Sequence, residues 1–266
     1  MAGSNLVRLE RVAPGVGLLV LSNPPLNLVT LDLTRALEQV LEEIASDEEI
    51  RVLVVTGVGE KAFCAGSDIK EFPSLRARNR VIEDKLDREN RVYDQLEDLP
   101  QPTIAAIRGL ALGGGLELAL CCDFRLVGDT ARLGVPEVKL GVFPGSGGLY
   151  RLPRAVGESR AKRLMFTGDF VGAAEAERIG LADEVVPDGE VLGRAERLAE
   201  QLAERPQPAL RAIKAGVRET AWVARERALQ RSLELSRHVF STPEAGEGVA
   251  AFLEKRQPDF NSPRRK

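Results

Sequence analysis

The sequence predicts an α/β protein in which a buried sheet is followed by a helical C-terminal region. Two observations lead to this prediction. In the first part of the chain, short continuous apolar runs alternate with segments of helical periodicity, as in sheets that helices cover on both faces. Beyond residue 155 the patterns are almost entirely helical. We therefore expect a core domain over residues 1–190 and a helical region over residues 191–266.

The first predicted elements follow from local composition. VGLLVLS (16–22) is a strand-like run that stops at two prolines, and RVLVVTG (51–57) is a second run closed by glycine. Between them, a helix is expected to begin at Thr30, because the following apolar side chains recur at helical spacing. These side chains are Leu33, Leu37, Val40, Leu41 and Ile44. We expect KAFCAGSD (61–68) to be a loop.

The middle of the chain continues this alternation. Residues 74–99 are dense in charge and have a weak helical period, which is typical of a solvated helix. TIAAIRG (103–109) and CDFRLVG (122–128) are two further strand-like runs, and the glycine-rich stretch between them leads into a helix. From SRAKRLMFTG (159–168) to GEGVAAFLEKR (246–256), helical patterns prevail.

Composition argues against several classes of function. The 266 residues carry a net charge of -3, which disfavours a strongly electrostatic nucleic-acid binder. The cysteines Cys64, Cys121 and Cys122 lack metal-site spacing, and His238 is the single histidine, so we expect neither a metal site nor a histidine-based triad. We expect the cysteines to be reduced thiols of the core.

Sequence features of membrane association are missing as well. The first residues, MAGSNLVRLERVAPG, have no apolar segment before their charges, so they do not resemble a signal peptide. The longest apolar stretches end well before about 20 residues, the length that spans a membrane. The expectation is a soluble, cytoplasmic protein that binds neither membranes nor nucleic acid.

The stretch GLALGGGLELAL (109–120) places three consecutive glycines and one glutamate inside an apolar run. Glycine lets a ligand approach the backbone, and a helix that begins near Gly114 directs unpaired N–H groups toward that space. A second loop, FCAGSD (63–68), also follows a buried strand, and one N–H group from each loop would form an oxyanion hole. The alternative is that the glycines only permit close packing. Nucleotide-binding glycine motifs do not occur.

Two carboxylates lie in apolar surroundings near these loops. Glu117 would lie in the first helical turn, where the helix dipole favours a negative charge, so a helix-start residue is one interpretation. Glu137 lies between Pro136 and Val138. Two partly desolvated carboxylates beside two N–H donors could divide general acid and general base work, which is the functional interpretation.

These motifs resemble the crotonase superfamily, and within it the enoyl-CoA hydratases. The similarity covers nearly the whole chain in the family's order and spacing, and GGG-x-E followed by PE and PGxGG is its most specific part. The matching segments are NPPLN (23–27), AFCAGSDIKE (62–71), residues 102–126, residues 133–157, residues 166–187 and FLEKRQPDF (252–260). The resemblance implies a spiral of β-β-α units and the reversible hydration of a trans-2-enoyl-CoA thioester.

The resemblance also implies roles for individual residues. The backbone N–H groups of Ser67 and Gly114 would bind the thioester oxygen in an enolate-like state. Glu117 would activate a water molecule for attack at the β-carbon, and Glu137 would exchange a proton with the α-carbon. Candidate residues for substrate and CoA binding are Ala65, Ser67, Asp68, Ile69, Lys70, Gly114, Phe252 and Lys255.

Coenzyme A would enter as part of the substrate, so no separate cofactor is expected. Family members form trimers that often pair into hexamers, and residues 191–266 would supply the trimer contacts. In relatives, the positions of Phe252 and Lys255 often reach the CoA of a neighbouring subunit. A solvated helix lysine is the alternative interpretation of Lys255.

Two other functions stay open. The first is another reaction on an acyl-CoA enolate, such as double-bond isomerisation, decarboxylation or thioester hydrolysis. Isomerases often keep only one of the two carboxylates, so the presence of both favours hydration. The second is an RNA-binding homologue that uses Arg76, Arg78 and Arg80, which the acidic balance disfavours. Leu149 and Tyr150 depart from the residues usual in hydratases, and we expect them to reshape the acyl pocket.

Overall fold

The computed structural model describes residues 6–221 and 223–260 and contains two sheets. The larger sheet has six strands in the order β1-β2-β3-β5-β7-β10. They are β1 (Val7–Ala13), β2 (Val16–Leu21), β3 (Val52–Gly57), β5 (Thr103–Ile107), β7 (Phe124–Gly128) and β10 (Glu184–Val186). β1 pairs antiparallel with β2, and the other neighbours are parallel. The four strands predicted from apolar runs are confirmed as β2, β3, β5 and β7.

The smaller sheet consists of short strands in the order β4-β6-β8-β9. They are β4 (Ala62–Cys64), β6 (Leu110–Leu112), β8 (Arg132–Gly134) and β9 (Phe170–Gly172). The chain passes from β3 to β4, from β5 to β6 and from β7 to β8, and helical segments follow each pair. This is the expected spiral of β-β-α units. The segment 61–68 contains β4 and is therefore not only a loop, because a three-residue strand is too short to show an apolar period.

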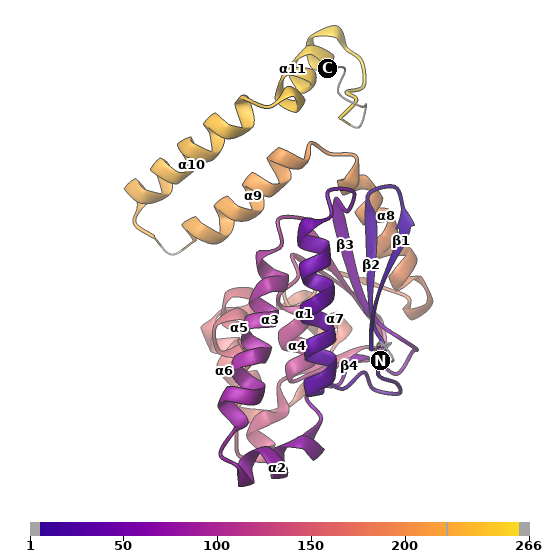
Figure 1. Ribbon diagram of the computed structural model, residues 1–266, viewed down its shortest axis with the longest axis vertical. Helices are drawn as coiled ribbons and strands as arrows, with labels where there is room; N and C mark the ends of the chain where they lie inside the picture. The colour runs from indigo at the N-terminus through magenta and orange to yellow at the C-terminus, as the bar shows by residue number, and fades with distance from the viewer. Residues whose placement is uncertain (1–5, 222, 261–266) are drawn as a thin grey trace.

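Helices cover both faces of the larger sheet (Figure 1). Leu19 and Leu21 of β2 pack in one apolar cluster with α1 (Leu31–Ser46) and α3 (Asp87–Asp98), whereas Leu18 and Val20 pack in another with α8 (Val191–Ala203). The central strands β2, β3, β5 and β7 are buried on both faces, which explains their continuous apolar sequences. The expected boundary at residue 190 falls just before α8, a helix that packs against the sheet.

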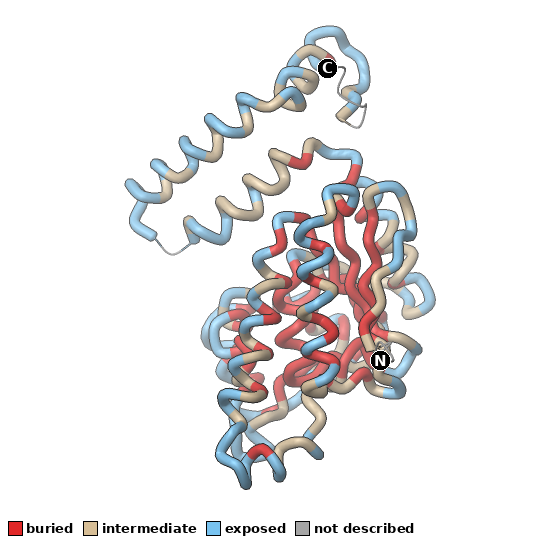
Figure 2. Tube along the Cα trace, in the orientation of Figure 1, coloured by how far each residue is buried: buried red, intermediate tan, exposed pale blue. Residues whose placement is uncertain are grey.

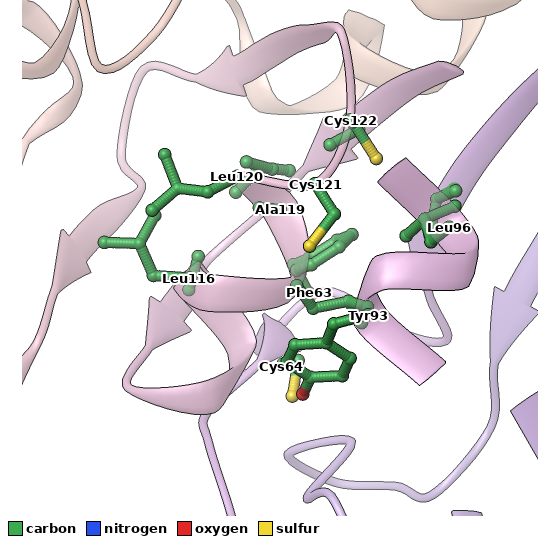
Figure 3. Packing of buried hydrophobic residues seen from close by; sticks show 14 of the residues in the cluster. Phe63, Cys64, Tyr93, Leu96, Leu116, Ala119, Leu120, Cys121 and Cys122 are labelled. Atoms are coloured by element: carbon green, nitrogen blue, oxygen red, sulfur yellow. The ribbon is translucent and has the colours of Figure 1, made fainter. Parts of the chain in front are cut away.

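Shorter helical segments connect these elements. They are η1 (Ile69–Glu71), α2 (Phe72–Ala77), the π-helix η2 (Val81–Leu86), α4 (Gly114–Ala119), η3 (Pro136–Leu140), α5 (Gly148–Val156), α6 (Glu158–Thr167), α7 (Ala173–Arg178) and η4 (Asp188–Glu190). α4 begins at Gly114, as predicted. It packs against Phe63, Cys64 and Tyr93 in the core, where all three cysteines are buried and free of disulfides, as expected (Figure 3).

The charged segment 74–99 is not the single solvated helix that its composition suggested. It forms α2, η2 and α3, and one of its faces is buried. The side chains on that face are Lys85, Glu89, Val92, Tyr93 and Leu96. The two charged side chains can be buried because they form an ion pair, in which Lys85 Nζ lies 3.1 Å from Glu89 Oε1.

The last three helices extend from the core as an arm (Figure 1). They are α9 (Gln207–Thr220), α10 (Arg225–Phe240) and α11 (Pro243–Glu254), and Figure 2 shows that the arm is mostly exposed or half-buried. An ion pair between Lys214 and Asp123, 2.8 Å long, joins α9 to the core. Exposed apolar side chains of the arm include Ile213, Val217, Leu229, Leu233, Phe240, Val249, Phe252 and Leu253. A single chain therefore leaves much apolar surface of the arm uncovered.

Within the described ranges 6–221 and 223–260, none of the helices combines the length and the apolar character needed to cross a membrane.

Candidate active site

Three of the predicted site residues follow the ends of neighbouring strands in the smaller sheet. Ser67 comes after β4, Gly114 after β6 and Glu137 after β8. Because β4, β6 and β8 are parallel, their carboxyl ends meet at one edge of the sheet. The topology therefore brings together three segments that lie far apart in the sequence.

The loops after β4 and β6 approach each other closely because Gly66 and Gly114, which have no side chains, lie where they meet. A β-carbon on Gly66 would lie 3.7 Å from the Gly114 nitrogen, and one on Gly114 would lie 3.7 Å from the Ser67 nitrogen. Val29 holds the first loop, since its N–H donates to Gly66 and its carbonyl accepts from Asp68, each at 2.9 Å. Neither the Ser67 N–H nor the Gly114 N–H donates a hydrogen bond within the part of the chain that the structure describes. Both are available for a substrate oxygen, as an oxyanion hole requires.

Each of the three consecutive glycines is required for a different structural reason. Gly113 has a φ of +51°, and a β-carbon there would lie 3.1 Å from Glu137 Oε1. Gly114 permits the close approach of the loop after β4. A β-carbon on Gly115 would overlap the carbonyl oxygen of Cys64, so this glycine lets α4 pack on β4. The packing explanation thus holds for Gly115, whereas the other two glycines shape the site.

Glu117 is buried, with 2% of its surface exposed. Its Oε1 atom accepts hydrogen bonds of 2.8 Å from the backbone N–H groups of Ser146 and Gly148. Burial raises the pKa of Glu117 to about 8, and the charge of Glu137 adds to the effect. A residue that only starts a helix would gain nothing from this burial, so the helix-start interpretation does not account for the geometry.

Glu137 lies in η3 and has a carboxylate oxygen without a partner. Its Oε2 atom is buried and makes no hydrogen bond within the described residues. Burial raises the pKa of Glu137 above its ordinary value of 4.5. A buried carboxylate oxygen without a partner is costly in free energy and is typical of functional sites. The charge of Glu137 adds to the burial that raises the pKa of Glu117, so the two carboxyl groups interact electrostatically.

The two glutamates and both loops line one cavity of about 680 Å³. This volume lies in the range of small-molecule sites, roughly 300–1,000 Å³. Much of the wall is apolar and comes from η1, α2, η2 and the segment after η3. The apolar side chains are Ile69, Phe72, Val81, Leu86, Val142 and Phe143. The cavity can therefore hold an apolar group beside the reactive carboxylates.

The structure brings some of the CoA-binding candidates to this cavity. Those that line it are Ala65, Ser67, Ile69 and Gly114. Asp68 and Lys70 lie in the same segment without lining the cavity, and the Asp68 carboxylate accepts a 3.0 Å hydrogen bond from the Lys70 N–H. Phe252 and Lys255 lie at the C-terminal end of α11, at the opposite end of the molecule from α2, and do not reach the cavity of their own chain (Figure 1).

Several residues that support the site were not predicted from the sequence. The Tyr93 hydroxyl donates a 2.9 Å hydrogen bond to the carbonyl of Gly114. The Ser146 hydroxyl donates to Glu89 Oε2 at 2.6 Å, while its backbone N–H donates to Glu117. Glu89 and Tyr93 are four residues apart, as Lys85 and Glu89 are, so a buried face at helical spacing was the available signal.

Two residues expected to reshape the acyl pocket do not line the cavity. Leu149 and Tyr150 are 53% and 39% exposed, and the Tyr150 hydroxyl donates to Asp94 on α3. The expectation about them is therefore wrong for the cavity as the structure shows it, because their position at the start of α5 directs them to the surface. Arg76, considered above for RNA binding, lines the cavity, and Arg80 pairs with Asp84 at 2.6 Å.

This arrangement can stabilise an enolate and move protons. Two N–H donors suit an oxygen that gains negative charge, and two carboxyl groups with raised pKa values suit proton transfer near neutral pH. Among the described residues, no cluster of three or more potential ligands could hold a metal ion.

Comparison with known proteins gives consistent matches along the chain. Residues 11–263 match the family model described as enoyl-CoA hydratase/isomerase. Crotonyl-CoA hydratase of Syntrophomonas wolfei is 38% identical over 89% of this chain and 90% of its own length. Short-chain-enoyl-CoA hydratase of Clostridium acetobutylicum is 38% identical over 87% of this chain and 88% of its own. The crystal structure of enoyl-CoA hydratase from Bacillus anthracis matches with a TM-score of 0.90 and 37% identity, over 96% of this chain and 98% of the other.

Proposed function

The chain belongs to the enoyl-CoA hydratase/isomerase family, and we propose that it is an enoyl-CoA hydratase acting on a trans-2-enoyl-CoA thioester. One observation carries the choice of hydration within the family: Glu117, which is buried, and Glu137, which is half-buried, line the same cavity. Hydration removes a proton from water and delivers one to the α-carbon. A pair of carboxyl groups supplies one group for each transfer.

The oxyanion hole supports the first half of this reaction. When water attacks the β-carbon, electrons shift to the thioester oxygen and form an enolate. The N–H groups of Ser67 and Gly114 have no other partner in the described chain, so they can bind this oxygen as its charge grows. Loss of one such donor typically lowers the rate by about 10²–10³.

The two glutamates divide the proton transfers. Oε1 of Glu117 is held by two backbone N–H groups, which leaves the other oxygen to take a proton from water. Glu137 then delivers a proton to the α-carbon, and the enolate collapses to the 3-hydroxyacyl-CoA. Burial raises the pKa of both carboxyl groups, which favours a form of the pair that holds one proton. Hydration proceeds from the arrangement in which Glu137 carries this proton and Glu117 is ionised.

The decisive experiment follows the loss of the conjugated enoyl absorbance of crotonyl-CoA with the wild type and the Glu137→Gln variant. The matched control is Glu204→Gln, because Glu204 is exposed and does not line the cavity. We expect wild type and control to form 3-hydroxybutyryl-CoA and the Glu137 variant to be nearly inactive. If the wild type instead moved the double bond of a 3-enoyl-CoA and added no water, an isomerase would replace this proposal.

The arm of α9, α10 and α11 is the proposed contact surface of a homotrimer, or of a hexamer of two trimers. The exposed apolar side chains of the arm support this proposal, because isolated domains rarely expose so many together. In such an assembly, Phe252 and Lys255 would reach the CoA of a neighbouring subunit. Light scattering should give three or six times the chain mass of 28.9 kDa, and the Phe240→Asp variant should give a smaller particle.

Coenzyme A is proposed to enter as part of the substrate, with no further cofactor. The two carboxyl groups and two N–H donors balance the protons and charges of hydration without one. Prolonged dialysis against a metal chelator should leave the rate of crotonyl-CoA hydration unchanged. A rate that fell and returned on adding a divalent cation would contradict this part of the proposal.

The proposed compartment is the cytoplasm. Cys64, Cys121 and Cys122 are buried free thiols, which suits a reducing environment. Fractionation of the source cells with an antibody against the protein would test this assignment.

A further inference from the structure

A buried charge cluster lies next to the oxyanion hole and outside the cavity wall. It consists of Glu71, Lys85 and Glu89, and the side chain of Lys85 is 0% exposed. Lys85 Nζ donates to the carbonyl of Val29 at 3.1 Å and to Glu71 at 2.9 Å, and it lies 3.1 Å from Glu89 Oε1. The ammonium group thus has a partner for each of its three N–H bonds. Such complete pairing offsets the cost of burying an ammonium group.

Glu89 contacts both loops of the active site through serine hydroxyl groups. Its Oε1 atom accepts a 3.3 Å hydrogen bond from Ser67, and its Oε2 atom accepts a 2.6 Å hydrogen bond from Ser146. The backbone N–H of Ser67 belongs to the oxyanion hole, whereas that of Ser146 donates to Glu117. One carboxylate therefore connects the group that binds the enolate oxygen with the group that activates water.

Both carboxylate oxygens of Glu89 are needed for this connection. A carboxylate accepts hydrogen bonds at both oxygens, and Lys85 Nζ lies 3.1 Å from Oε1. An amide at the same position would offer one acceptor and could not bind both hydroxyl groups in the same way. The position of Glu89 on α3 is in turn rigid, because the next turn of α3 is fixed by the hydrogen bond between Tyr93 and Gly114.

We propose that Glu89 is a positioning residue for hydration, which sets the distance between the oxyanion hole and Glu117 by binding Ser67 and Ser146. Glu89 does not line the cavity, so it contacts the reacting groups only through these two serines. Displacement of a reacting group by about 1 Å lowers rates by about 10²-fold, so a modest change in loop separation is measurable.

The variants Ser67→Ala and Ser146→Ala test this inference directly, because each removes a hydroxyl group and keeps the backbone N–H. We expect each to lower kcat for crotonyl-CoA by about five- to tenfold, with KM changed by less than about twofold. The double variant Lys85→Met/Glu89→Leu replaces the buried ion pair by apolar groups. Both charges are removed together, because removing only one would leave the other buried without its partner and could unfold the protein. In that background each serine substitution should lower kcat by less than about twofold, since its partner is already gone.

The matched control is Glu83→Gln, an exposed glutamate of η2, which should keep the wild-type kcat. The inference rests on the proposed hydration, so a second readout avoids turnover. The absorbance of the enolate of bound acetoacetyl-CoA reports the oxyanion hole, and both serine variants should weaken it. If the wild type gave this enolate signal but did not hydrate crotonyl-CoA, the proposed function would be refuted. The enolate signal of the serine variants would still measure whether Glu89 positions Ser67 and Ser146.

Two results would overturn the inference. The first is a pair of serine variants that keep both the wild-type kcat and the wild-type enolate signal. The second is that each serine substitution lowers kcat by the same factor in the wild-type protein and in the Lys85→Met/Glu89→Leu variant. Effects that multiply in this way belong to independent sites and would show that the serines do not act through Glu89.

Discussion

A β-carbon on Gly113 would lie 3.1 Å from Oε1 of Glu137, so the absence of a side chain on one residue provides the space for the other. Gly113 also has φ +51° and ψ −127°, a conformation that residues with a β-carbon avoid. Its N–H donates a 2.9 Å hydrogen bond to the carbonyl of Gly134, which ties it to the end of β8. The backbone before α4 and the carboxylate after β8 are thus placed by one contact.

Substituting this glycine should damage both activity and stability. We expect Gly113→Ala to lower kcat by about 10²-fold, because the methyl group displaces the Glu137 carboxylate. An alanine held in this positive-φ conformation is strained, so the substitution should also lower the free energy of unfolding by about 1–3 kcal/mol. Steady-state kinetics and urea denaturation measure the two effects. Gly189→Ala is the control, since a β-carbon there meets no atom within 4 Å, and equal behaviour of the two variants would refute the argument.

Removing either carboxylate should abolish turnover without unfolding the protein. We expect Glu117→Gln and Glu137→Gln each to lower kcat by about 10²–10⁴, because each loses one proton transfer while an amide of similar size keeps the packing. Crotonyl-CoA hydration and circular dichroism provide the measurements. A variant with near-normal turnover would show that the role assigned to its glutamate is wrong.

The activity should have a bell-shaped dependence on pH. The pKa of Glu117 is raised to about 8, so above this pH both glutamates are ionised and no proton remains for the α-carbon. At low pH both are protonated and none can activate water, and this limit lies above 4.5 because burial also raises the pKa of Glu137. The pH profile of kcat measures both limits. An activity that kept rising well above pH 8 would contradict the requirement for a retained proton.

Stability should respond to pH through Glu117 as well. Its pKa rises from 4.5 in the unfolded chain to about 8 in the folded one, so its contribution is complete below 4.5 and is lost as pH rises through 8. Glu117→Gln removes this dependence and should melt at a higher temperature than the wild type in alkaline buffer, with a smaller difference in acid. Thermal unfolding across this pH window checks the sign. Glu204→Gln, at an exposed position, should follow the wild-type curve.

The hydroxyl of Tyr93 should contribute to both the fold and the oxyanion hole. Tyr93→Phe removes the 2.9 Å hydrogen bond to Gly114 and leaves a buried carbonyl without that donor. We expect a loss of about 1–3 kcal/mol in the free energy of unfolding and a several-fold lower kcat. Chemical denaturation and crotonyl-CoA kinetics measure the two losses. Unchanged values for both would mean that Tyr93 only fills space.

Much of the larger sheet was predictable because its central strands carry their own signal. β2, β3, β5 and β7 are apolar on both faces, since α8 covers one side and α1 and α3 cover the other. The smaller sheet carries no such signal. Each of its strands has three residues, and only pairing with distant segments holds them in place.

The candidate site residues stand out in the sequence for a related reason. Ser67, Gly114, Glu117 and Glu137 stand in short motifs in which glycine and glutamate occupy apolar surroundings, and such local conflicts are typical of active sites. The role of Glu89 was not predictable in this way. In a segment rich in charge, a buried carboxylate looks like its solvated neighbours until its partners Lys85, Ser67 and Ser146 are placed around it.

The central strands, the glycine-rich loops and the candidate acid and base groups can be recognised in the linear chain, because each depends on neighbouring residues. Which polar groups stay unpaired is a property of the folded molecule. Among residues 6–221 and 223–260, the N–H groups of Ser67 and Gly114 find no partner and Glu137 keeps an unpaired oxygen, because parallel strands bring separate loops to one edge. The raised pKa of Glu117 has the same origin, since solvent is excluded only when these loops and α4 close around the carboxylate.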